Sequence, residues 1–217
     1  GDNYELAITI FPKAVMMDYH SALTGAGFRV LAYEIEAHAI ARSVVKYQNP
    51  QTIMIIDFGK TRTSFFVTSG AKVLFTSTLS NVGGENLTQS IKKNLNVSYE
   101  EAQQLKEKQG LLASNNKELI YALMPLVSVL SDEINKIYNY WNTHQSKEGG
   151  SGQQYIDQII VCGGQATLPG LIEYLAANFS VPVQIGNVWT NILPYDRVTP
   201  PITFKQSQKY ATSLGLA

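Results

Sequence analysis

Two glycine-containing turns, each directly after a predicted apolar strand, hold most of the residues in this sequence that could do chemistry. The first turn, Ile55-Ile56-Asp57-Phe58-Gly59-Lys60-Thr61-Arg62-Thr63, places a carboxylate beside a glycine and two hydroxyl groups. Backbone N–H groups without a neighbouring Cβ atom can approach an anion closely, and hydroxyls add donors. A carboxylate repels phosphate, so Asp57 is expected to hold Mg²⁺ indirectly or to orient a water molecule. An aspartate that only caps the turn is the structural alternative.

The second turn is Ile160-Val161-Cys162-Gly163-Gly164-Gln165-Ala166-Thr167-Leu168-Pro169-Gly170. Here Gly163 and Gly164 would let a flat or anionic ligand lie against the backbone, and the N-terminus of the following helix adds a favourable dipole. Each turn taken alone also fits ordinary packing. The two turns are about 105 residues apart, and we expect them to border one common cavity.

The composition limits the classes of protein that can carry these turns. The 217 residues include 17 Lys plus Arg and 17 Asp plus Glu, a balance that disfavours nucleic-acid binding. The hydrophobic fraction of 45% is enough for a core, and Cys162, the single cysteine, rules out an internal disulfide. The apolar run 119–130 is about half of what a bilayer crossing needs. We therefore expect a cytoplasmic chain without direct membrane insertion.

Apolar runs and amphipathic stretches alternate along the chain, which is typical of an α/β protein. The predicted strands cover 4–11, 28–35, 52–56, 64–68, 72–79, 156–161 and 181–185. Three predicted helices have both bounds: 36–46, 117–141 and 210–217. Four more are predicted from their starting points, after Pro12, after Gly83-Gly84, after Ser98 and after Pro169-Gly170. A capping box opens the helix after Ser98, Pro125 kinks the longest helix or marks its first turn, and 146–154 forms a flexible loop.

Both turns match motifs of a known superfamily. Asp57-Phe58-Gly59 fits the D-x-G hairpin of the second phosphate motif, and 163–170 fits the adenosine motif G-G-x-x-x-x-P-G. In these residues and their order the chain resembles the actin-like ATPases. The resemblance implies a ribonuclease H-like α/β domain, whose mixed sheet carries helices on both faces, and an ATP and Mg site. Glu36 would open the connecting helix and position a magnesium-bound water, or serve only as an N-terminal helix carboxylate.

Within that superfamily the chain is most similar to the PilM family of type IV pilus assembly. The similarity rests on several short stretches of sequence. They are 26–28 followed by 33–36, 81–88, 99–102 followed by Leu105-Lys106, and 213–217. The similarity implies a scaffold peripheral to the inner membrane, which binds a PilN-like membrane protein segment and other pilus assembly proteins. The expected nucleotide contacts, apart from Asp57 and Glu36, are Gly59, Lys60, Thr61, Thr63, Gly83, Gly84, Gln103, Lys106, Gly163, Gly164 and Gln165.

The same resemblance implies a domain plan with parts missing. We expect 1–30 to be a strand–helix remnant of a first-domain subdomain and 31–217 to be the second domain. Its core would be 31–80 and 155–217, with a subdomain inserted at 81–154. The first phosphate motif of the superfamily is absent, Lys60 and Arg62 replace small residues, and Gln103 replaces a glutamate. The two cations would help to bind phosphate or fill its space, so we expect weak ATP binding.

Two alternatives stay open from the sequence. The first is an ATP-hydrolysing or phosphotransferase member of the same superfamily, which would need catalytic groups in the first domain. The second is an FtsA-like cell-division protein, which would need a C-terminal amphipathic helix for membrane attachment.

Overall fold

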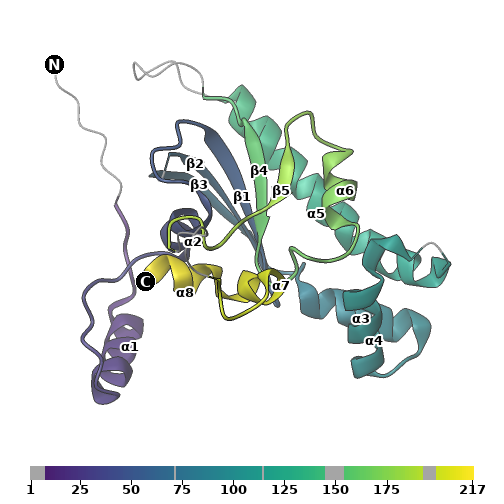
Figure 1. Cartoon of the computed structure of the whole chain (residues 1–217), viewed down its shortest axis with the longest axis horizontal. Coiled ribbons are helices and arrows are strands. Elements are labelled where there is room, and N and C mark those ends of the chain that lie inside the picture. The colour runs from purple at the N-terminus through teal and green to yellow at the C-terminus, as the bar shows by residue number, and fades with distance from the viewer. Residues whose placement is uncertain (1–7, 71, 114, 145–153, 193–198) are drawn as a thin grey trace. The chain divides into compact units, whose positions relative to one another are not determined.

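The computed structural model describes residues 8–70, 72–113, 115–144, 154–192 and 199–217, and the predicted loop at 146–154 lies almost wholly outside them. The chain forms two units, Gly1–Glu36 and Ala37–Ala217. Figure 1 shows the ribbon of both, and each unit is described separately below. The division of the second unit into a core and an inserted subdomain stays a prediction.

The first unit contains the helix α1, Lys13–Gly25, and its other described residues, 8–12 and 26–35, form no helix or strand. The helix follows Pro12 as predicted, and Gly27, with φ +86°, lies just beyond its end. The predicted strands at 4–11 and 28–35 are wrong over their described residues, which have no regular structure. A strand needs a neighbour for its backbone hydrogen bonds, and the described residues of this unit contain none.

The second unit is built on a five-stranded mixed sheet in the order β3-β2-β1-β4-β5. The strands are β1 (Thr52–Phe58), β2 (Thr63–Ser69), β3 (Lys72–Leu79), β4 (Gln158–Cys162) and β5 (Val183–Ile185). The first three form antiparallel hairpins, whereas β4 pairs in parallel with both β1 and β5. The central strand β1 is therefore the apolar run of the sequence that is buried on both faces.

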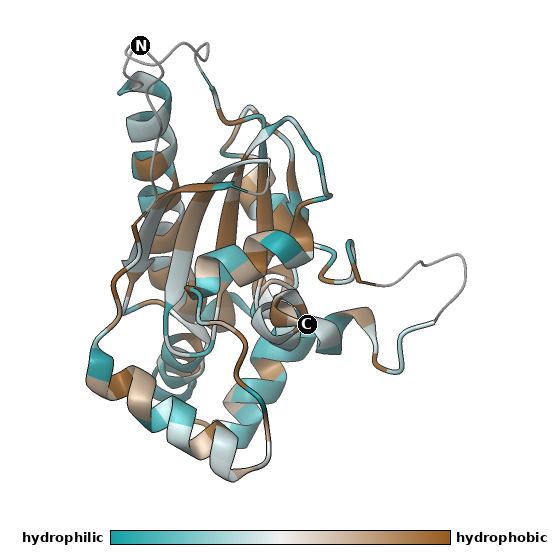
Figure 2. Cartoon of the chain, turned by 90° about the vertical axis from the view of Figure 1, so that its left-hand side faces the viewer, coloured by the Kyte–Doolittle hydropathy of each residue, from teal (hydrophilic) through white to brown (hydrophobic). Residues whose placement is uncertain are grey.

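Helices cover both faces of this sheet, as predicted. Alternate β1 residues, among them Met54 and Ile56, pack into a core with the helices α3, α5 and α6. On the opposite face, α2 packs against the sheet. A Cβ atom on Gly186, the residue after β5, would lie 2.8 Å from Ile160 Cγ2 of β4 and 3.1 Å from Val44 Cγ1 of α2. Figure 2 shows the strands as a mainly apolar layer between more polar helices.

Each predicted helix has a counterpart in the structure. The helices after α1 are α2 (Glu36–Val44), α3 (Gly84–Leu95), α4 (Tyr99–Lys108), α5 (Lys117–Thr143), α6 (Leu171–Ala176), α7 (Phe204–Ser207) and α8 (Ala211–Leu216), with 3₁₀ turns η1 (Gly110–Leu112) and η2 (Gln208–Tyr210). Of these, α7 and η1 were not predicted. Ser98 caps α4 by accepting a hydrogen bond from the Glu101 N–H. Pro125 lies inside α5. Among the described residues, no helix combines the length and apolarity needed to span a membrane.

Candidate functional site

The two glycine-containing turns lie side by side at the carboxyl ends of β1 and β4. These strands are parallel neighbours, and Asp57 is paired in register with Cys162. A Cβ atom on Gly163 would clash with Asp57 Oδ1, and Gly163 has a φ of +88°, so only glycine fits there without strain. The Gln165 N–H donates to the Phe58 carbonyl over 2.9 Å. The two turns are therefore in contact, and the expectation that they border one common cavity stays a prediction.

The β1–β2 turn is held rigidly by the start of α3. Within the turn, the Gly59 N–H donates to the Arg62 carbonyl over 3.0 Å. From α3, the Gly84 N–H donates to the Gly59 carbonyl over 3.0 Å and the Glu85 N–H to the Lys60 carbonyl over 2.8 Å. The first N–H groups of a helix have no partner inside the helix. Here those donors bind the carbonyl groups of the turn and so fix its backbone to α3.

The polar side chains of this turn separate into exposed and buried ones. Lys60, Thr61 and Arg62 are exposed at its tip. Thr63 is fully buried, and its hydroxyl donates to the Val82 carbonyl over 2.7 Å. Thr63 therefore ties β2 to the segment before α3, and its expected nucleotide contact stays a prediction.

Lys106 also holds the first turn of α3. Its side chain is 6% exposed, and Nζ donates to the Gly84 carbonyl and to Thr88 Oγ1, both over 2.8 Å. Burial lowers the pKa of the Lys106 ammonium below its usual value, with nearby Lys60 adding a smaller effect in the same direction. Gln103, three residues earlier on α4, is exposed and donates to Glu107 Oε1 over 3.0 Å.

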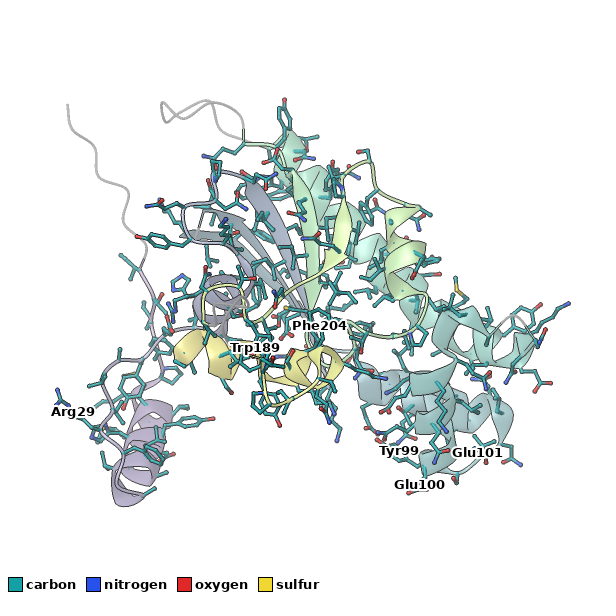
Figure 3. All side chains as sticks on the ribbon, in the orientation of Figure 1. Arg29, Tyr99, Glu100, Glu101, Trp189 and Phe204 are labelled. Atoms are coloured by element: carbon teal, nitrogen blue, oxygen red, sulfur yellow. The ribbon has the colours of Figure 1, made fainter. Side chains whose placement is uncertain are left out.

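A second polar contact between α3 and α4 is absent from the sequence-based predictions. The Tyr99 hydroxyl donates to Glu85 Oε2 over 2.7 Å, and Gln89 Nε2 donates to Glu85 Oε1 over 2.9 Å. These hydrogen bonds, that of Gln89 first, lower the pKa of Glu85, and the bond to Glu85 raises the pKa of Tyr99. Figure 3 shows Tyr99 with Glu100 and Glu101 at the start of α4. No periodic pattern in the sequence links positions 85 and 99.

The glycine pair of the second turn contacts two further elements. The Gln165 side chain lies against Gly84, where an added Cβ atom would be 2.5 Å from Gln165 Nε2. The stem of Lys209, from η2, lies over Gly164, with Cγ 3.5 Å from the corresponding Cβ position. The contact of Lys209 with Gly164 is not predicted from the sequence, because nothing in the residues around Lys209 distinguishes it from other exposed lysines.

Pro169 and Gly170, at the end of the segment 163–170, pack on η1. The Leu111 N–H donates to the Pro169 carbonyl over 2.8 Å, and Gly170, with φ +81°, leaves room for Leu111 and Leu112. The structure thus brings Asp57, Gly59, Gly83, Gly84, Lys106, Gly163, Gly164 and Gln165 together through contacts between neighbouring elements. Glu36, the last residue of the first unit, opens α2, and its expected catalytic role stays a prediction.

A sequence model of the family described as "Type IV pilus assembly protein PilM" matches residues 12–217. This match covers nearly the whole chain. The chain belongs to the PilM family of type IV pilus assembly proteins. Because the matched range includes α1 and the whole second unit, the family assignment does not depend on the two turns alone.

Solved structures show that the fold is that of the actin-like proteins. A PilM–PilN type IV pilus biogenesis complex is 19% identical at a TM-score of 0.68, and the alignment covers 93% of this chain and 56% of that one. MreB 5 of Spiroplasma citri bound to AMPPNP is 16% identical at a TM-score of 0.68, with 95% and 64% covered. EutJ from Carboxydothermus hydrogenoformans is 18% identical at 0.60, with 91% and 58% covered. The chain therefore spans between half and two thirds of these proteins.

Proposed function

We propose that this chain is the second actin-like domain, together with part of the first, of a nucleotide-binding scaffold in the type IV pilus assembly platform. In this proposal the parent protein is cytoplasmic, lies at the periphery of the inner membrane and binds a PilN-like membrane protein segment. Membership of the PilM family and the fold shared with a PilM–PilN complex support the assembly role. The contact between Asp57 and Gly163 carries the nucleotide part of the proposal.

The residues present fit a nucleotide and Mg²⁺ in their chemistry. The Asp57 carboxylate supplies the oxygen ligands that Mg²⁺ or its bound water prefers, and it is half-buried at the end of β1. Gly163 and Gly164 present backbone without side chains, which suits a close approach by an anionic or flat ligand. When bound, Mg²⁺ would neutralise phosphate charge. The protein contributes a backbone that is already ordered, because α3 binds the β1–β2 turn and the Gln165 N–H, in the turn after β4, binds the carbonyl of Phe58 at the end of β1.

Thermal unfolding of the whole gene product, with and without Mg-ATP, tests the nucleotide part. We expect Mg-ATP to raise the Tm of the wild type, since a ligand that binds only the folded state stabilises it. Asp57→Ala should abolish this rise. Asp132→Ala, at an exposed position on α5, removes the same charge elsewhere and should preserve it. An unchanged Tm in the wild type would refute nucleotide binding and leave only the scaffold role.

The partner part is tested separately by titrating a fluorescent peptide from a PilN-like cytoplasmic segment into the whole gene product. We expect saturable binding, and a dependence of its Kd on Mg-ATP if the nucleotide state is communicated to the partner site. Binding that Asp57→Ala leaves intact but makes insensitive to Mg-ATP would support such coupling. Failure of the peptide to bind in any nucleotide state would refute the assembly role.

A further inference from the structure

We propose that β3 is an interaction surface at which a second copy of this chain binds, by antiparallel pairing of its own β3 with this one. The inference does not rest on the proposed nucleotide site and can be tested without it. β3 is the outermost strand of the sheet and pairs with β2 along one side only. Figure 1 shows it beside β2, at the other end of the sheet from β5.

The outer side of β3 carries backbone groups that have no protein partner among the described residues. In a strand, the N–H and C=O groups of successive residues point alternately to one side and to the other. Those on the inner side pair with β2, and within the described part of the chain the backbone of 73–79 makes no other hydrogen bond to protein. Such an unpaired row is a template to which another strand can add.

The features that usually protect an edge strand are confined to one end of β3. Lys72, its first residue, is the only charged residue of the strand, which contains no proline. The register with β2 shifts between Val67 and Thr68, and this leaves Leu74 in a bulge without a partner. Charges, prolines and bulges normally prevent other strands from adding to an edge. The residues 75–79 contain none of them, so they form a regular and uncharged edge.

The side chains of this edge match those of their own copy. When two copies of 75–79 pair about a two-fold axis at Ser77, Thr76 lies opposite Thr78, and Phe75 lies opposite Leu79. Paired threonines and paired apolar side chains both stabilise neighbouring strands. The two kinds of pair also lie on separate faces of the joined sheet. Thr76 and Thr78 are exposed on one face, whereas Phe75 and Leu79 are half-buried against the core on the other.

Three properties favour a second copy of this chain over another extended segment. The chain has a formal net charge of zero, so two copies do not repel each other overall. Antiparallel pairing places Lys72 of each copy at opposite ends of the shared ladder, whereas parallel pairing would place the two ammonium groups side by side. Both partners are strands already ordered by pairing with β2, so neither loses the chain entropy that a disordered peptide would lose. The contact is small, so we expect a weak and reversible dimer.

Sedimentation equilibrium of the whole gene product, without nucleotide and over a wide range of concentrations, tests the inference. We expect a monomer–dimer equilibrium with a Kd on the order of 10–100 μM. Thr76→Lys should weaken the dimer by about tenfold or more, because each new ammonium lies diagonally across from its own copy near the centre of the paired edge. Gln104→Lys, at an exposed position on α4, adds the same charge elsewhere and should leave the Kd unchanged. Circular dichroism of both variants should match that of the wild type.

Cysteine cross-linking tests the register of the two strands. Mixed in equal amounts, the variants Thr76→Cys and Thr78→Cys should form a disulfide-linked dimer faster than either variant alone, because the pairing places these two positions directly opposite each other. Cys162 is fully buried and is present in every sample, so it does not account for a difference between them.

Several outcomes would overturn the inference. A protein that stays monomeric at every concentration would refute it, and so would a dimer that Thr76→Lys leaves intact. A dimer that Gln104→Lys weakens as much as Thr76→Lys does would also refute it, because added charge alone would then explain the effect. Cross-linking of each cysteine variant with itself as fast as in the mixture would refute the antiparallel register. Because nucleotide is absent throughout, none of these results bears on the proposed nucleotide site.

Discussion

Replacing Lys106 with methionine tests whether this buried ammonium holds α4 to the start of α3. Methionine keeps the length and apolar stem of the side chain but removes the donors to Gly84 O and Thr88 Oγ1. Each hydrogen bond from a charged donor contributes ~1.5–3 kcal/mol, and removing a buried charge recovers part of that through the lost desolvation cost. We expect a net decrease of about 1–3 kcal/mol in the free energy of unfolding.

Urea denaturation followed by circular dichroism measures this change. The control is Lys108→Met, an exposed lysine two residues further along α4, for which we expect a change below ~0.5 kcal/mol. A double-mutant cycle with Thr88→Val should reveal a coupling of about 0.5–3 kcal/mol between the two side chains. Equal effects of the two lysine substitutions, or additivity with Thr88→Val, would refute the interpretation of Lys106 as a structural link.

The pH dependence gives a second measurement on the same pair of proteins. Burial lowers the pKa of Lys106 in the folded state below its usual value of 10.5. At a pH between the lowered pKa of the folded state and the usual pKa of the unfolded chain, the unfolded chain binds more protons than the folded protein. The free energy of unfolding therefore rises with pH in this interval. The stability of the wild type relative to Lys106→Met should therefore increase as the pH rises toward 10.5. A difference that is constant or shrinks would contradict the direction of the shift.

Three further substitutions or measurements test the packing. Gly163→Ala should lower stability by ~2 kcal/mol or more, because the residue has φ +88° and its Cβ would overlap the Asp57 carboxylate; an unchanged Tm would refute the contact. Pro125→Ala should raise stability by ~1–3 kcal/mol in urea titrations, because the exposed α5 position regains an N–H that can donate to the Tyr121 carbonyl. Cys162, fully buried, should react with a thiol reagent only as fast as the chain opens, and rapid labelling of the native protein would contradict its burial.

The sheet of the second unit was predictable because its strands carry their own signals. The uninterrupted apolar run at 52–56 indicates a strand buried on both faces, and the structure places it at the centre of the sheet. The hairpins follow from short polar turns between β-prone runs. The segment 28–35 is also rich in β-prone residues, yet its described residues form no strand, since strand formation also requires a partner that the described part of its unit does not contain.

The contact between the two turns was also predictable, but the roles of single polar side chains were not. Parallel pairing of β1 and β4 brings Asp57 and Gly163 together once the fold is correct. The nucleotide contact expected of Lys106 comes from the resemblance to the family and stays a prediction, whereas its observed partners, Gly84 and Thr88, are set by how α4 packs on α3. Lys209 reaches Gly164 for a similar reason. Such contacts depend on tertiary packing, which leaves no local signal in the sequence.

Gly83 and Gly84 provide a matched test of how firmly α3 holds the β1–β2 turn. A Cβ atom on Gly83 would lie 2.7 Å from the Lys60 carbonyl oxygen, which is backbone and cannot move without moving the turn. A Cβ atom on Gly84 would instead meet the Gln165 side chain, which can rotate away, and alanine favours the helix by about 1 kcal/mol over glycine. Gly83→Ala should therefore cost ~1–3 kcal/mol of stability and weaken any ATP-induced rise in Tm, while Gly84→Ala should be nearly neutral in urea denaturation. The reverse order would mean that the turn adapts freely and that Gln165, rather than α3, keeps it in place.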